Sequence, residues 1–366
     1  MPEASDRGAG NLRRNEPRPE RPGPKGRERE REHLDRVLEA MGERDVDLLL
    51  LGREGNARYV SGARRLWLGG TRAFAPGCAV VRETGAVHVL SVTDDGIPSD
   101  IPPERLYPIS WNPMNLLHPV VGAPGVAGAR RVGVDGITPL FEQLLTGMLP
   151  SAELVDGESL VRSVRRKKSV ADVEAIRAAA AVADDAMVAT IDALRPGVRE
   201  IDLMGVFDER MTGHGVTTPA YDAVVSVAEE GAVGAWSTDR VIDDGDLVTI
   251  SAGVLAHGWE ASLARTWPCG EIGSADRASL QTWSEAWSEL VDGCRVGARV
   301  GQLRSDGIDL HGVGASYEVL PDDDVLEPDM VVALELRRAG VLGGDTLLVT
   351  ERGCEPLTHA PRAAVA

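Results

Sequence analysis

The chain has 366 residues, of which 43% are hydrophobic and 26% charged, and this length allows two domains with cores of their own. Its 57 Asp and Glu residues outnumber its 39 Lys and Arg residues, which gives a formal net charge of -18. Because binding to phosphates depends on basic side chains, this balance argues against nucleic acid and anionic membranes as partners.

The four cysteines, Cys78, Cys269, Cys294 and Cys354, lie far apart and include no C-x-x-C pair. Neither a disulfide framework nor a structural zinc site is indicated. The N-terminus lacks the apolar region of a signal peptide, and no run of about 18 apolar residues could span a bilayer. We therefore expect a soluble, cytoplasmic protein.

Residues 1–32 hold five prolines, nine basic and seven acidic residues, and almost nothing apolar. Such a segment buries too little apolar surface to offset the entropy lost on ordering. It is predicted to be a disordered tail.

A first domain is predicted over residues 33–160. A helical pattern begins at His33 and leads into the apolar run 47–51, which indicates a buried strand. Short strand-like runs at 78–81, 86–92 and 131–134 then alternate with Gly and Pro turns. The pattern is typical of a small α/β domain.

A second domain is predicted over residues 165–360. After the basic hinge 165–169, Ser169 is a candidate N-cap for a helix over 170–194. Further helices are predicted at 200–213 and 275–293, and strands at 223–227, 247–254, 261–266, 331–336 and 346–350. Trp283 and Trp287 share one helix face and are predicted to pack in the core. This order of elements is typical of an α+β domain with helices packed on a sheet.

Several C-terminal segments, in order, resemble the strands and turns of the M24 peptidases. These segments are 246–253 (DLVTISAG), 258–259, 265–266, 311–314 (HGVG, similar to HGIG), 326–330 (LEPDM, similar to LEPGM) and 345–354 (DTLLVTERGC, similar to DTVLVTEDGC). The family includes methionine aminopeptidase, aminopeptidase P, prolidase and creatinase, which share the pita-bread fold.

Two N-terminal segments resemble the creatinase and prolidase branch of that family. Residues 56–62 (NARYVSG) are similar to its N-x-x-Y-L-T-G, and the hinge before Ser169 is similar to its R-x-x-K-S. The resemblance covers about residues 33–360. It implies an α+β protein with a pita-bread C-terminal domain, a smaller α/β creatinase-type N-terminal domain, and a homodimer.

The resemblance also implies a set of metal-ligand positions. In the family's metallopeptidases two divalent ions lie among two Asp, one His and two Glu residues. Carried over, these positions fall on Ser251, Ser262, His311, Glu335 and Gly344. One carboxylate then remains where four normally balance the ions, and neutral serine hydroxyls are poor ligands. We expect no metal ligand set and no cofactor, with the dinuclear Mn, Co or Zn site lost.

Neighbouring residues could change the charge of this site. Residues two apart on a strand share a face, so Glu260 is expected beside Ser262, and Arg337 beside Glu335. Arg337 or a protonated His311 would compensate the Glu335 carboxylate.

Creatinase is the metal-free precedent in the family. Its loop His corresponds to residues 234–236, its Glu to Ala264 and its second substrate-binding His to Glu318. None of these positions keeps the creatinase residue, so creatine hydrolysis is not expected.

The candidate site that remains is polar and partly aromatic. His311 and Glu335 are its predicted catalytic residues. The predicted substrate-binding residues are Ser251, Ser262, Trp236, Glu318, Arg337 and Thr346.

Three functions stay open at this stage, and with them whether the chain is an enzyme. The first is a pseudo-hydrolase that binds a small-molecule or peptide-like ligand. The second is a metal-independent hydrolase or lyase for a small amide or amino-acid-like substrate, with His311 as acid/base and Glu335 orienting it. The third is an ordinary Xaa-Pro dipeptidase or aminopeptidase, which requires ligands that the sequence lacks.

An open cleft with His311 and Glu335 in hydrogen-bond reach would favour the second function. A cleft filled by Trp236, or sealed by an Arg337–Glu335 pair, would favour the first.

Overall fold

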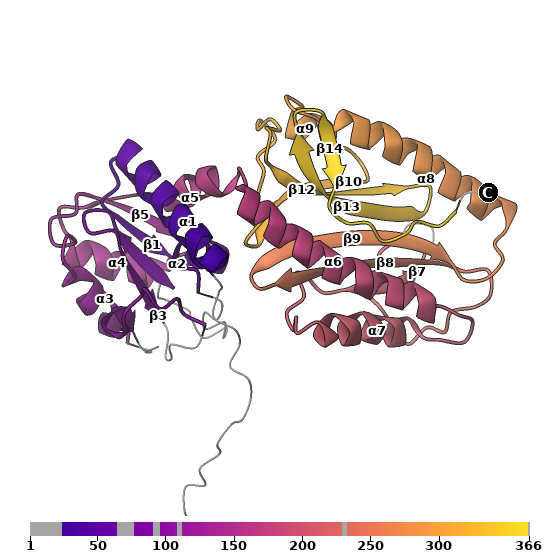
Figure 1. Ribbon diagram of the computed structural model, residues 1–366, viewed down its shortest axis with the longest axis horizontal. Helices are drawn as coiled ribbons and strands as arrows, with labels where there is room; N and C mark the ends of the chain where they lie inside the picture. The colour runs from indigo at the N-terminus through magenta and orange to yellow at the C-terminus, as the bar shows by residue number, and fades with distance from the viewer. Residues whose placement is uncertain (1–23, 64–76, 91–95, 108–111, 229–232, 365–366) are drawn as a thin grey trace, which may run out of the picture.

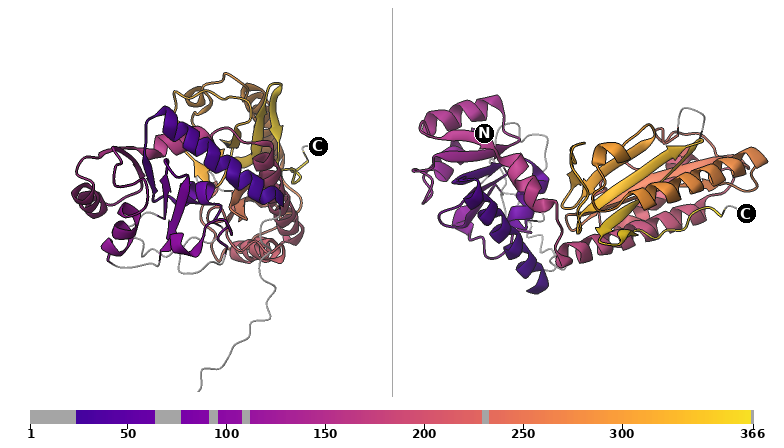
Figure 2. Two further views of the ribbon diagram at one scale, coloured as in Figure 1. Left: turned by 60° about the vertical axis from the view of Figure 1, so that its left-hand side comes forward. Right: turned by 90° about the horizontal axis from the view of Figure 1, so that it is seen from above.

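The computed structural model describes residues 24–63, 77–90, 96–107, 112–228 and 233–364. They form two units that lie side by side and are joined through helices α5 (Gly157–Arg165) and α6 (Val170–Ala193) (Figure 1; Figure 2, right). No helix within these ranges is long and apolar enough to cross a membrane.

The N-terminal unit is built on a six-stranded sheet. Its strand order is β4 (Leu106–Tyr107), β3 (Ala86–Leu90), β2 (Cys78–Val81), β1 (Leu48–Leu51), β5 (Arg131–Asp135) and β6 (Glu153–Asp156). Around it lie α1 (Pro24–Glu43), α2 (Glu54–Ser61), the 3₁₀ helix η1 (Pro103–Arg105), α3 (Met114–Val121) and α4 (Pro139–Met148). The predicted strand 86–92 ends at Leu90 in the structure, and its last two residues lie outside the described ranges.

The continuous apolar run of β1 is explained by its central place in this sheet. It pairs with β2 on one side and with β5 on the other. Leu49 and Leu51 enter one apolar cluster, and Leu48 and Leu50 enter another. Because successive side chains of a strand point to opposite faces, both faces are buried and every position is apolar.

The prediction of a disordered tail is wrong for residues 24–32, because α1 begins at Pro24. Glu32 and Arg36 are four residues apart with the acid first, a spacing that stabilises helices. Arg36 also donates a hydrogen bond to the carbonyl of Val164 in α5 (2.7 Å). Low apolar content therefore did not prevent order here, and residues 1–23 lie outside the described residues.

The C-terminal unit contains an eight-stranded sheet. The order is β11 (Tyr317–Glu318), β10 (Ile308–Val313), β12 (Val331–Arg338), β13 (Val341–Thr350), β9 (Trp259–Pro268), β8 (Leu247–Ala256) and β7 (Val224–Val227), with β14 (Gly353–Pro356) also paired to β13. Helix α6 packs on β8 and β9, α7 (Glu200–Gly213) on β7, and α8 (Ser274–Gly293) on β12, while the short α9 (Val300–Leu303) lies beside β10.

Two local predictions for this unit are confirmed. The Ser169 hydroxyl accepts a hydrogen bond from the Asp172 N–H (3.2 Å), and the Asp172 carboxylate accepts one from the Ser169 N–H (3.0 Å). This reciprocal capping box starts α6 at Val170. Trp283 and Trp287 are buried in the core and stacked, with ring centroids 5.4 Å apart.

The two units meet at a buried ion-pair cluster. Glu318 on β11 contacts Lys168 (2.7 Å) and Arg165 (3.2 Å), which precede α6. Arg165 also donates a hydrogen bond to the Asn56 side chain (2.5 Å), and Asn56 donates one to Asp135 at the end of β5 (2.6 Å). A chain of buried polar contacts thus runs from one sheet to the other.

Replacing Glu318→Gln would leave the buried charges of Lys168 and Arg165 without their carboxylate. Removing one partner of a buried ion pair costs about 3–5 kcal/mol. We therefore expect a large fall in the free energy of unfolding and in Tm. Thermal and urea unfolding measure it.

The matched control is Asp202→Asn, which breaks the exposed Arg199–Asp202 pair and should leave Tm almost unchanged. Equal melting temperatures for the two variants would contradict the structural role given to Glu318.

Candidate functional site

His311 lies at the centre of the candidate site, on β10. Its side chain is buried and stacks on Tyr317, with ring centroids 4.5 Å apart. Nε2 is 3.6 Å from a Glu260 oxygen on β9, and Nδ1 is 3.5 Å from an Asp309 oxygen. Neither nitrogen makes a hydrogen bond of good geometry to a described residue. The imidazole is therefore held between two carboxylates at ion-pair distance.

The two carboxylates change the proton affinity of this ring. Burial by itself would lower the pKa of His311, but Asp309 and Glu260 outweigh burial and raise that pKa to about 9. The contact with His311 in turn holds the pKa of Asp309 below its usual range. The two carboxylates therefore favour the protonated form of His311.

Glu335 on β12 forms the second part of the site. It lies opposite Asp309 in the β10–β12 pairing and accepts a hydrogen bond from the Ser251 hydroxyl on β8 (3.4 Å). The Tyr221 hydroxyl lies 3.2 Å from the same serine oxygen. Burial raises the pKa of Glu335, and the positive charge of Arg337 opposes that rise. The predicted proximity of Arg337 to Glu335 is consistent with this interaction.

The carboxylates that face His311 are thus Glu260 and Asp309, and Glu335 bonds Ser251 instead. Sequence reasoning weighed Glu260 as a displaced acid but missed Asp309, Tyr221 and Tyr317. The alternation of Asp309 with His311 was a usable signal, because residues two apart on a strand share a face. No comparable signal pointed to the tyrosines.

Two residues that were predicted to bind substrate make structural contacts with other segments of the chain. The fully buried Thr346 hydroxyl accepts from the Ser262 N–H (3.0 Å) and donates to the Ser262 carbonyl (2.9 Å), so it joins β13 to β9. Glu318 is bound to Lys168 and Arg165 at the junction between the units. Both predictions were based on position within a motif, and a motif does not show which other residues a side chain contacts in the fold.

Trp236 does not fill the site. Its side chain is 71% exposed, in the loop between β7 and β8. Arg337 is also exposed, whereas Ser251 and Ser262 are buried. Of the predicted set, the structure brings His311, Glu335 and Ser251 together with Glu260 and Asp309 around them.

Few ligand side chains occupy the positions to which the family's metal ligands were carried over. Ser251 and Ser262 provide no carboxylate, and a Cβ atom at Gly344 would lie 2.7 Å from both the Glu335 Cγ and the Leu334 carbonyl oxygen. Within the described ranges, no group of three or more His, Cys, Asp and Glu side chains is arranged to hold a metal ion.

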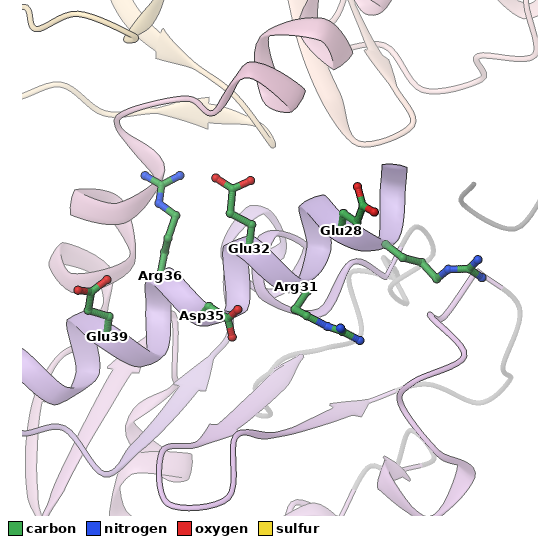
Figure 3. Close-up of a pocket in the computed structure, with 7 residues that line it drawn as sticks. Glu28, Arg31, Glu32, Asp35, Arg36 and Glu39 are labelled. Carbon is green, nitrogen blue, oxygen red and sulfur yellow. The ribbon is translucent and has the colours of Figure 1, made fainter. Parts of the chain in front are cut away.

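A separate hollow of about 570 Å³ lies along α1. It is lined by Arg27, Glu28, Arg31, Glu32, Asp35, Arg36 and Glu39 (Figure 3). Glu32 and Arg36 extend from one side of the helix, and Arg31 and Asp35 from the other. These side chains come from a single helix and include none of the predicted site residues, so the hollow is a charged surface outside the candidate site.

Comparison with known proteins places this fold in a family. Residues 33–167 match the Creatinase/Prolidase N-terminal domain, and residues 174–306 match Metallopeptidase family M24. A Xaa-Pro dipeptidase of Pyrococcus horikoshii is 22% identical over 91% of this chain and 99% of its own. A creatinase of a Bacillus species is 24% identical over 89% of each chain.

Solved structures agree with these matches. The prolidase of Pyrococcus horikoshii OT3 superimposes with a TM-score of 0.73 at 20% identity, covering 90% of this chain and 99% of the prolidase. Two units in this order, with these matches, define a creatinase N-terminal domain followed by a pita-bread domain. The chain is an M24-family, creatinase/prolidase-like protein.

The His311 cluster should make stability depend on pH in the alkaline range. The folded pKa of about 9 lies above the unfolded value of about 6.5, so the contribution is complete below pH 6.5 and is lost as pH rises to 9. We expect the stability advantage of the wild type over His311→Gln to shrink by on the order of 3 kcal/mol across that range. Urea unfolding at a series of pH values measures this change. A difference in stability between the two proteins that stays constant with pH would contradict the contacts of His311 with Glu260 and Asp309.

Proposed function

We propose that this M24-family protein is not a dinuclear metallopeptidase and that it binds a small-molecule or peptide-like ligand at the His311 site. The observation that carries the proposal is the pairing of Glu260 and Asp309 with His311. A histidine ligates a metal through a neutral nitrogen with a free lone pair. Here both ring nitrogens face carboxylates, an arrangement that favours the protonated ring.

The charges around the cluster support the same proposal. Glu260 and Asp309 face the cationic His311, and Glu335 interacts with Arg337. Binding two divalent ions here would require His311 to lose its proton and Glu260 and Asp309 to give up their contacts with the protonated ring. The net negative charge of the chain supports a further part of the proposal, that the protein binds neither nucleic acid nor membranes.

Assembly and location belong to the proposal as well. The resemblance to the creatinase and prolidase branch supports a homodimer, and we place the protein in the cytoplasm. Light scattering coupled to gel filtration measures the molecular mass, and a monomer would contradict the proposed dimer.

Elemental analysis paired with a thermal-shift titration tests the central proposal. We expect less than stoichiometric metal in the purified chain and no rise in Tm with manganese, cobalt or zinc at neutral pH. A ligand that binds only the folded state must raise Tm as it saturates. An active M24 metallopeptidase treated in parallel is the positive control. Two ions per chain, or a sharp shift with one metal, would overturn the proposal and make proline-containing dipeptides the next substrates to assay.

A second candidate function is metal-independent cleavage of a small amide or amino-acid-like substrate. It is favoured by the two buried His311 nitrogens that lack hydrogen-bond partners, since a protonated ring in a site is suited to act as a general acid. Glu335 would orient the substrate beside it.

Amine release from a panel of small amides, measured in the presence of chelator, separates the two candidates. The binding proposal predicts no turnover. Turnover that disappears in His311→Gln and persists in the surface variant Asp202→Asn would instead establish the metal-independent enzyme.

A further inference from the structure

Two cysteines that lie 60 residues apart in the sequence meet in the C-terminal unit. Cys294 follows the last residue of α8, and Cys354 lies in β14. Their Sγ atoms are 3.0 Å apart, and both thiols are free. A disulfide has an S–S length of about 2.05 Å, so the sulfurs need to approach by only about 1 Å.

The backbone on both sides of this contact is fixed by hydrogen bonds. The Cys294 N–H donates to the carbonyls of Leu290 (3.0 Å) and Val291 (3.1 Å) at the end of α8. Cys354 is paired with Val349 in the β13–β14 ladder. Both cysteines belong to the apolar cluster that contains Trp287. The two thiols are therefore held facing each other by regular structure.

We propose that Cys294 and Cys354 are a redox-active dithiol that closes to a disulfide when a small disulfide such as glutathione disulfide is the oxidant. The proposal is independent of the function proposed for the His311 site. The other two cysteines are buried elsewhere, Cys78 in β2 and Cys269 just after β9, so they serve as internal references.

The unequal exposure of the two thiols sets the order of the steps. Cys354 is partly exposed, whereas Cys294 is fully buried, and its contact with the Cys354 thiol together with burial raises the pKa of Cys294. The Cys354 thiolate attacks one sulfur of glutathione disulfide, which forms a mixed disulfide and releases one glutathione. The Cys294 thiolate then attacks the Cys354 sulfur and releases the second. One oxidant accepts two electrons, and the two thiol protons leave with two glutathiones.

Closing this bond would enclose much of the candidate site in one covalent loop. The segment from Cys294 to Cys354 contains β10, β11, β12 and β13, and with them His311 and Glu335. A disulfide stabilises mainly by limiting the freedom of the unfolded chain, and more so for long loops. Oxidation is thus expected to stabilise the part of the fold that carries the site.

The experiment equilibrates the full chain in glutathione buffers of increasing oxidised fraction, followed by acid quenching, alkylation and peptide mapping. We expect two of the four thiols to be lost, the mass to fall by two hydrogen atoms, and one cross-linked peptide to join Cys294 to Cys354. The oxidised protein should melt roughly 5 °C higher than the reduced protein.

Matched variants distinguish a specific Cys294–Cys354 disulfide from non-specific oxidation of the cysteines. Cys354→Ala should abolish the cross-link and the rise in Tm, and Cys269→Ala should keep both. Four alkylated thiols at every buffer composition would overturn the proposal, as would a persistent glutathione adduct on Cys354 or a cross-link through Cys78 or Cys269.

Discussion

The buried carboxylate of Glu318 is the constraint on which the relation between the two units depends. It balances Lys168 and Arg165, two cations that are themselves buried. Charges removed from water are tolerated only when they are paired with good geometry, so these three side chains fix one another. Glu318 also pairs with Gly312, the residue after His311, in the β10–β11 ladder. The position of the candidate site is therefore coupled to the hinge that joins the units.

The same electrostatic reasoning applies inside the site. In a dinuclear centre of this family, carboxylates are held together by two divalent ions. Here Glu260 and Asp309 are held by one imidazole ring, and Glu335 by a serine hydroxyl and the field of Arg337. Gly344 adds a steric constraint, because the Glu335 side chain occupies the space that a Cβ would need. Under the proposed function, the residues that replace the family's metal ligands form one set of contacts that holds these carboxylates without metal ions.

The sequence was sufficient for much of the fold, and the reasons are local. The apolar run of β1, the capping box of Ser169 and the tryptophan spacing of α8 each follow from periodicity or from a single side-chain bond. The sequence motifs identified the family to which the chain belongs. The error at residues 24–32 has a physical cause too: composition measures apolar burial, whereas the start of α1 carries charge spacing and a contact to α5.

The site was less predictable because its contacts join strands whose relative register the sequence does not state. A motif identified His311 and Glu335, but the contact of His311 with Glu260 depends on how β9 lies relative to β10. Thr346 and Glu318 likewise have partners on other segments. The wide spacing of the cysteines in the sequence also gave no sign that Cys294 and Cys354 lie in contact. Sequence separation is a poor guide to distance in a sheet whose neighbouring strands come from remote segments.

These remote contacts converge on one stretch of chain. The segment between Cys294 and Cys354 carries His311, Glu318 and Glu335; at one side Glu318 binds it to the hinge, and at its ends the two thiols meet. A segment fixed at both places has little freedom to rearrange independently of the rest. A ligand that bound beside His311 would act on strands that contact the N-terminal unit through Glu318 and that lie between the two facing thiols, so that binding, ion pairing and thiol state involve one segment of the chain.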